Sequence, residues 1–284
     1  MARFTNQAQL SYNNTVVSSN IVVGEILEVV SAAKTAVTDT YTADGTVTYA
    51  VSIVNTGSTA VTGLTVTDDL GAYLQDGVTR VPLSYTDGSA LLFINGVLQP
   101  SPVTNPGPPL TVSGITLPAD SDMVLVYTVE VNSLAPLDLT GSIVNTATVT
   151  GNGIPTPVIA TETVTPVQAP QLRITKSLEP AAVSENGTLT YRFTIENFGN
   201  LDATATDNVS LSDLFDPILS GITVDLDGTG WTEGTQYTYD GTTGAFATVP
   251  GQITIPAATY TQDPATGEWS TQPGTAVLRV TGTV

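Results

Sequence analysis

The sequence predicts an all-β protein made of two tandem Ig-like β-sandwich domains. Short runs of alternating apolar and polar residues are separated by Gly, Pro, Asn and Asp, and no 3.6-residue pattern lasts beyond two turns. The 284 residues include 25 Gly and 18 Pro, and this length suits two domains that can each bury a core. An internal repeat, described below, supports the tandem arrangement.

The first predicted element is a strand over residues 4–12, FTNQAQLSY. Phe4, Ala8 and Leu10 share one phase of this stretch with Asn6. Residues 143–151, IVNTATVTG, have the same layout, with Asn145 directly after the first apolar residue of its phase. Residues 24–33, GEILEVVSAA, come nearest to a helix, but their β-branched residues favour a strand or an extended linker.

The two halves of the chain then match each other. GTVTYAVSIVNTG begins at Gly45 and GTLTYRFTIENFG begins at Gly187, an offset of 187 − 45 = 142 residues. Lys34 and Lys176 are separated by the same offset, 176 − 34 = 142. LTVTD (64–68) corresponds to VSLSD (209–213), and VLVYTVEV (124–131) to VLRVTGTV (277–284). Between them, an Asn95-Gly96 pair predicts a type I′ hairpin turn.

After residue 131 the first half continues to the IVNTATVTG strand, but no counterpart follows residue 284. We therefore expect an N-terminal donor-strand segment (1–27), a first sandwich (28–167) and a second sandwich (168–284) that lacks its last strand. The N-terminal strand would complete the second sandwich of a neighbouring copy by β-strand addition, and such a head-to-tail contact generates an open filament. Two alternatives remain: the strand folds back onto its own second domain, or it is a flexible tail.

Six polar residues lie in the apolar phase of their predicted strands, and we expect all six to face a core. The first set, Lys34, Asp68 and Asn145, lies entirely in the first predicted sandwich. The second set consists of Lys176 and Asp213 in the second predicted sandwich and Asn6 in the N-terminal strand. The chain contains no other Lys. A buried salt bridge with an Asn hydrogen bond is one explanation of such a set.

An isopeptide bond that forms autocatalytically is the more specific explanation. Burial lowers the pKa of a lysine toward the neutral amine and raises that of an aspartic acid. The amine would attack the Asn carboxamide while the acid polarises it and relays protons as ammonia leaves. The repeat selects the acids, since Asp68 maps to Asp213 whereas Asp69 maps to Leu214 and Glu130 to Thr283. We expect one bond within a subunit, Lys34–Asn145, and one between subunits, Lys176–Asn6.

Several of these motifs resemble a bacterial surface-repeat family, the domain of unknown function eleven. The resemblance rests on the two lysines, GTVTY and GTLTY, VNTG and ENFG, TVTD and SLSD, LPAD and NTATVTG, over about residues 30–151 and 172–284. It implies a sandwich repeat of cell-surface proteins. Two such repeats without a signal peptide are similar to subunits of clostridial endospore appendages, which are made inside the mother cell. This implies an extracellular fibre on the cell or spore surface.

Composition excludes several functions. The net charge is −19, so nucleic acid and anionic membranes are poor partners. The chain has no Cys and no His, which removes disulfides, thiolate metal sites and the usual nucleophilic triads. No apolar run is long enough to span a bilayer, and MARFTNQ does not resemble a signal peptide. We expect no enzyme activity on external substrates, no cofactor and a homopolymeric partner.

Other candidates are weaker. Residues 225–230, DLDGTG, resemble the start of a Ca²⁺ loop without its later Glu, and a turn is the favoured interpretation. Trp231, Trp269 and the ten Tyr could line a carbohydrate surface, but their spread favours packing between sheets. The alternative to a filament subunit is a cell-surface adhesin or stalk module that binds a host or matrix ligand.

Overall fold

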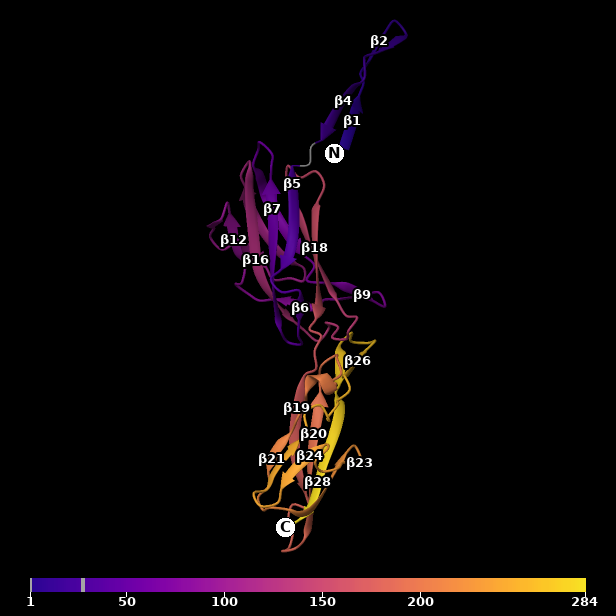
Figure 1. Ribbon diagram of the computed structural model, residues 1–284. Helices are drawn as coiled ribbons and strands as arrows, with labels where there is room; N and C mark the ends of the chain where they lie inside the picture. The colour runs from indigo at the N-terminus through magenta and orange to yellow at the C-terminus, as the bar shows by residue number, and fades with distance from the viewer. Residues whose placement is uncertain (1, 27–28) are drawn as a thin grey trace. The chain divides into compact units, whose positions relative to one another are not determined.

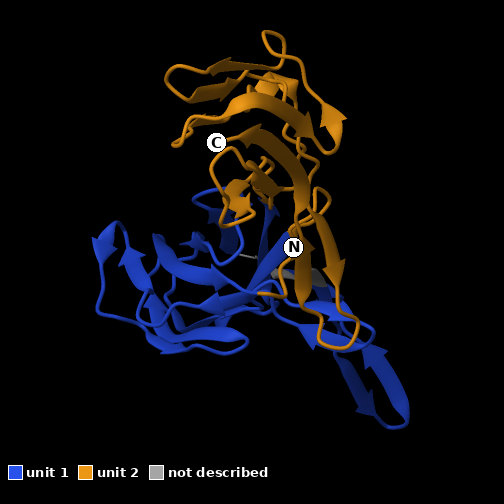
Figure 2. Cartoon of the chain, turned by 90° about the horizontal axis from the view of Figure 1, so that it is seen from below, with its two compact units in different colours: residues 1–132, 143–165 blue, residues 133–142, 166–284 orange. Residues whose placement is uncertain are grey.

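The computed structural model describes residues 2–26 and 29–284, and within them the chain is all-β with a single 3₁₀ turn, η1 (Ala205–Asp207) (Figure 1). It divides into two compact units: residues 1–132 with 143–165, and residues 133–142 with 166–284 (Figure 2). Residues 133–142 therefore group with the second unit, although the expected domain boundary assigns them to the first. The reason is local, since the backbone N–H of Trp269 donates to the carbonyl of Ser133.

The N-terminal segment forms a two-stranded hairpin, where the sequence predicts one continuous strand. The outgoing strand is interrupted at Gln7 and Ala8, where the Ala8 N–H donates to the Ser19 hydroxyl. Asn13 and Asn14, both with positive φ, make the turn. Among the described residues these strands pair only with each other: β1 (Ala2–Asn6) with β4 (Val22–Ile26), and β2 (Gln9–Tyr12) with β3 (Thr15–Ser18).

The first unit packs two six-stranded sheets face to face. The first sheet has the order β13-β12-β16-β7-β5, with β11 also on β16, and the second has the order β14-β15-β8-β17-β18-β6. The strands of the first sheet are β5 (Val30–Ala36), β7 (Thr46–Asn55), β11 (Leu83–Tyr85), β12 (Leu91–Ile94), β13 (Val97–Leu98) and β16 (Ser121–Val131). Those of the second are β6 (Thr40–Tyr41), β8 (Val61–Asp68), β14 (Val103–Asn105), β15 (Leu110–Leu117), β17 (Ile143–Asn152) and β18 (Val158–Pro166). A separate hairpin comprises β9 (Tyr73–Gln75) and β10 (Val78–Arg80).

Strict alternation builds the core of this unit. Along β7, Val47, Tyr49, Val51 and Ile53 are fully buried while the residues between them are not. A shift of one residue would move this whole set to the outer face, so the pattern fixes the register. The predicted turn at Asn95-Gly96 is confirmed, because both residues have positive φ between β12 and β13.

The second unit has a similar main sheet and a much smaller second sheet. The main sheet has the order β19-β20-β28-β22-β23, and the second contains only β21-β25-β24. The main strands are β19 (Leu172–Glu179), β20 (Thr188–Asn197), β22 (Ser220–Leu226), β23 (Thr229–Gly230) and β28 (Gly274–Thr283). The others are β21 (Ser212–Leu214), β24 (Tyr237–Asp240), β25 (Ala245–Thr248) and a hairpin of β26 (Thr259–Gln262) with β27 (Trp269–Gln272). Phe193, Phe215, Phe246 and Leu278 lie in its core, and Trp231 packs against it.

Residues 225–230 form the turn that the sequence favours over a Ca²⁺ loop. Asp227 and Gly228 have positive φ between β22 and β23. The Asp225 carboxylate accepts the Gly228 N–H and pairs with Arg279 at 3.0 Å. Across the described part of the chain, no group of three or more His, Cys, Asp or Glu is placed to hold a metal ion. Among the described residues, no helix is long and apolar enough to cross a membrane.

Candidate functional site

Lys34 and Asp68 form an ion pair inside the first unit. Lys34 lies on the edge strand β5 of one sheet, and Asp68 ends β8 of the other, so the pair joins the two layers. The side chains are 0% and 2% exposed. The Lys34 Nζ also lies 4.6 Å from the ring centre of Tyr49 and 5.9 Å from that of Tyr127. The expected burial of both charged residues is confirmed.

Burial changes the protonation chemistry of this pair. It lowers the pKa of the Lys34 amine, although the neighbouring Asp68 charge and hydrogen bond oppose that change. Burial and the Asp68 charge hold the pKa of the Tyr127 hydroxyl well above its usual value. The site therefore favours the neutral, nucleophilic form of the amine more than water does.

Asn145 lies on β17, the strand that borders Asp68. β17 pairs with β8 so that Ala147 is opposite Asp68, and Asn145 is two residues away on the same face. Asn145 is fully buried, and neither its amide nitrogen nor its oxygen has a hydrogen-bond partner. The hydroxyl of Tyr49 is also buried without a hydrogen bond. Burial raises the pKa of Tyr49, and the nearby Asn145 side chain offsets part of this increase in a geometry that does not make a hydrogen bond.

An unsatisfied buried carboxamide is costly and needs a reason. Here it occurs in the same interior as a desolvated Lys–Asp pair, with Asp68 fixed by the Leu70 N–H at 3.0 Å. A primary amine, a carboxyl group and a carboxamide are the three groups that amide exchange requires. Lys34 lies on one sheet and Asn145 on the other, so an amide bond between their side chains would join the two sheets.

Lys176 and Asp213 form the same ion pair in the second unit, but at its surface. Their side chains are 42% and 19% exposed. All residues of β19 are exposed, including the apolar Leu172, Ile174 and Leu178, whereas Val30 and Ala32 of β5 are partly buried. The expectation that Lys176 lies in the core is therefore wrong for the single chain.

The difference in exposure has a specific cause. In the first unit, Asp68 lies between two strands, opposite Leu110 of β15 and Ala147 of β17. In the second unit, Asp213 lies opposite Phe246 of β25. On the other edge of β21, where β17 would lie, the described residues supply no strand. The inner face of β19 is left uncovered as a result.

Asn6 is exposed, and it lies at the end of β1 opposite Val22. In the single chain the hairpin pairs with no strand of either sandwich among the described residues, so the burial of Asn6 in a neighbouring copy stays a prediction. The exposed apolar side chains of this hairpin lie on both strands: Phe4, Leu10, Tyr12, Val16, Val17, Ile21, Val22 and Val23.

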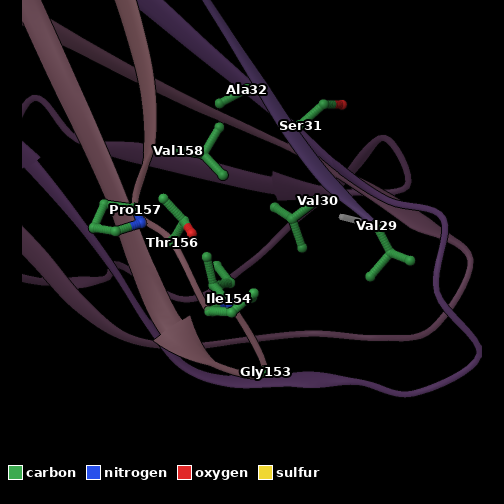
Figure 3. Close-up of a pocket in the computed structure, with 10 residues that line it drawn as sticks. Val29, Val30, Ser31, Ala32, Gly153, Ile154, Thr156, Pro157 and Val158 are labelled. Atoms are coloured by element: carbon green, nitrogen blue, oxygen red, sulfur yellow. The ribbon is translucent and has the colours of Figure 1, made fainter. Parts of the chain in front are cut away.

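A cavity of about 320 Å³ in the first unit does not contribute to the Lys–Asp–Asn site. It lies between the start of β5 and the loop that joins β17 to β18, with Val30, Ile154 and Val158 among the side chains around it (Figure 3). None of its ten lining residues is titratable. Its lining offers the hydroxyl groups of Ser31 and Thr156 but no side-chain acid or base.

Tyr49 and Tyr127 are members of the site that sequence reasoning missed. Both lie in the buried phase of their strands, so the sequence pattern alone assigns them to ordinary core packing. The repeat could have identified Tyr49, because Tyr191 occupies the equivalent position in the GTLTY motif of the second half. Tyr127 has no such counterpart, since Val280 occupies its repeat position.

No protein-family model matches the sequence, and no curated protein matches it either. Solved structures with a partial likeness include three pilus proteins. The RrgB pilus backbone of Streptococcus pneumoniae has 12% identity and a TM-score of 0.35 over 86% of this chain. The major pilin BcpA of Bacillus cereus has 11% identity and 0.37 over 96%, covering 73% of BcpA. The major pilin SpaD of Corynebacterium diphtheriae has 12% identity and 0.36 over 90%, covering 69% of SpaD.

This chain spans only about half of that RrgB chain, 55%. At these TM-scores the superposition carries no argument about function.

Proposed function

We propose that this chain is the structural subunit of an extracellular bacterial filament, of the pilus or spore-appendage kind. Subunits join head to tail when the N-terminal segment of one copy completes the second unit of the next. Lys34–Asn145 bonds within subunits and Lys176–Asn6 bonds between subunits then lock the fibre. The observation that carries this proposal is the contrast between two equivalent ion pairs, one buried beneath β17 and one exposed where the described residues provide no covering strand.

The open edge of β21 supports strand addition. An unpaired edge offers backbone donors and acceptors to an incoming strand, and exposed apolar residues beside it provide the side-chain contacts. Leu172 and Ile174 of β19 are 40% and 55% exposed, which is unusual for the inner phase of a sandwich strand. A strand seated on β21 would cover both.

The N-terminal hairpin has the layout of the element that covers the first unit. There, β17 and β18 form an antiparallel pair with Asn145 opposite Glu162. In the hairpin, Asn6 is opposite Val22 in the same antiparallel sense. The donated element is then a whole hairpin rather than one strand. With the register of β17 on β8, Ala8 would lie opposite Asp213 and Asn6 would face Lys176.

A neighbouring copy is the partner that this geometry favours. Transfer between copies is heterologous, because the donor surface and the acceptor surface are different parts of the chain, so each added copy presents a new acceptor. Homopolymer formation therefore requires no further protein, nucleic acid or membrane insertion.

Boiling the purified protein in SDS tests the proposal. The wild-type chain should run as a ladder of multimers, because amide bonds between subunits survive denaturation. Lys176→Ala and Asn6→Ala should each abolish the ladder. Arg173→Ala is the matched control, since it removes a cation from the same strand that contacts Phe198 rather than Asp213. A wild-type chain that runs only as a monomer would instead favour a stalk or adhesin module.

A further inference from the structure

Tyr127 holds the carboxylate of the buried pair in one orientation. Its hydroxyl donates to Oδ2 of Asp68, the same oxygen that pairs with the Nζ of Lys34. The other oxygen, Oδ1, accepts the Leu70 N–H at 3.0 Å. Tyr127 is itself fully buried on β16, so its ring cannot move without disturbing the core.

The exposed pair has no such hydroxyl. Tyr127 lies opposite Tyr49 in the β16–β7 ladder, and the residue opposite Tyr191 in the β28–β20 ladder is Val280. Within the described residues, the hydrogen bonds to the Asp213 carboxylate come from Lys176 and the Leu214 N–H. The two sites share the lysine and the acid but differ in what fixes the acid.

We infer that Tyr127 is a positioning residue for bond formation between Lys34 and Asn145, because it holds Oδ2 of Asp68 against the Lys34 amine. This inference rests on the proposed crosslink. The reaction forms a bond between Nζ and the Asn145 carboxamide carbon and breaks the carbon–nitrogen bond of that carboxamide. Asp68 accepts one proton from the Lys34 ammonium and passes it to the departing nitrogen, and the second proton that Nζ loses as the amide forms follows the same route, so that ammonium leaves and the carboxylate is regenerated.

If the Asp68 carboxylate rotates between accepting a proton and donating it, the reaction loses the rate advantage that a fixed geometry provides. Misplacement of a reacting group by about 1 Å can cost roughly 100-fold in rate. We therefore expect Tyr127→Phe, which keeps the ring and removes the hydroxyl, to slow the internal reaction roughly 10- to 100-fold. The final extent of bond formation should be unchanged.

The experiment follows the loss of ammonia over time. Full-length chain carrying Lys176→Ala, which cannot form the second bond, is produced by cell-free translation and quenched in acid at intervals for intact-mass measurement. Tyr127→Phe is compared with Tyr85→Phe, a matched control whose hydroxyl accepts the Ala90 N–H at 3.1 Å away from the site. The control should react at the wild-type rate and Tyr127→Phe should lag. Equal rates for Tyr127→Phe and wild type overturn the inference.

Hydrogen exchange separates positioning from packing. In an Asn145→Ala background, where no bond can form, Tyr127→Phe should leave amide protection along β16 unchanged. A loss of protection that accounts for the slower reaction assigns Tyr127 a packing role and overturns the inference. If the wild-type chain never loses ammonia, the crosslink itself fails, which is a distinct result. With Lys176 present, the intermolecular ladder of Tyr127→Phe should form at the wild-type rate, because the second pair makes no use of this hydroxyl.

Discussion

Lys34 and Asp68 join the two sheets of the first unit through an ion pair that water does not reach. The equivalent pair of the second unit, Lys176 and Asp213, is open to solvent. The repeat places the same two residue types on equivalent strands, so the difference in exposure comes from what covers each pair. The proposed reaction and the proposed assembly both follow from that difference.

The internal bond should be visible as a missing ammonia. In a Lys176→Ala background, which cannot form the second bond, the intact mass of a Lys34→Ala chain should equal the mass calculated from its sequence, whereas the chain that keeps Lys34 should be lighter by one ammonia. The physical reason is that the buried amine displaces the Asn145 nitrogen. Asn145→Ala should likewise show no loss of ammonia. A wild-type chain of full calculated mass would contradict this prediction.

Removal of the acid should both prevent the bond and destabilise the first unit. Asp68→Asn leaves the Lys34 charge buried without its partner, and breaking a buried pair in this way costs about 3–5 kcal/mol. The comparison should be made by urea denaturation in an Asn145→Ala background, so that loss of the crosslink does not contribute. Asp213→Asn is the matched variant in the second unit, where exposure limits the cost to about 1 kcal/mol or less. Equal costs at the two positions would count against the burial argument.

Assembly should protect the exposed strand of the second unit. Amides of β19, where Leu172 and Ile174 are uncovered in the single chain, should become inaccessible when a hairpin is seated on the edge of β21. Hydrogen exchange measured on assembled protein and on a chain lacking residues 2–26 checks this. Protection confined to residues outside β19 and β21 would rule out the proposed docking position.

The stability of the uncrosslinked first unit should rise with pH below about pH 10. Burial lowers the pKa of Lys34 from its ordinary 10.5, so the unfolded chain binds more protons than the folded chain between the folded pKa and about 10.4. The free energy of unfolding therefore increases with pH in that interval. Above about pH 10 the raised pKa values of Tyr49 and Tyr127 act in the opposite direction.

This prediction is checked with Asn145→Ala by urea denaturation between about pH 7 and 9.5, followed by tyrosine circular dichroism. Both tryptophans, Trp231 and Trp269, lie in the second unit, so their fluorescence reports that unit separately. Lys34→Met in the same background removes the titrating group and should abolish the rise. A free energy that stays flat in the presence of Lys34 would contradict it.

The sequence predicts much of this fold because alternation and turn chemistry are local. The buried phase of β7 and the Asn95-Gly96 turn both follow from neighbouring residues. The repeat likewise brings Lys34 and Asp68 to one interior. The hairpin was not predicted, because nothing in residues 4–12 specifies that residues 15–26 return alongside them. Tyr127 was missed because a tyrosine that hydrogen-bonds to Asp68 occupies the same apolar phase of its strand as any other core tyrosine.

The burial of Lys176 was expected from its phase, but phase only determines which face of β19 a side chain occupies. Whether that face is covered depends on a strand beside β21, which no pattern within residues 172–215 can supply. The same limit applies to Asn6, whose partner in the proposed fibre belongs to another copy.

The most direct test of the account is mass spectrometry of proteolytic peptides from multimers excised after boiling in SDS. The account predicts a branched peptide in which the Nζ of Lys176 is joined to the side-chain carbonyl of Asn6 with loss of one ammonia. In multimers assembled from a mixture of isotopically light and heavy chains, part of this peptide should contain one light and one heavy arm, which a bond within one chain cannot produce. Multimers in which Lys176 and Asn6 occur only as unmodified peptides would contradict the central claim.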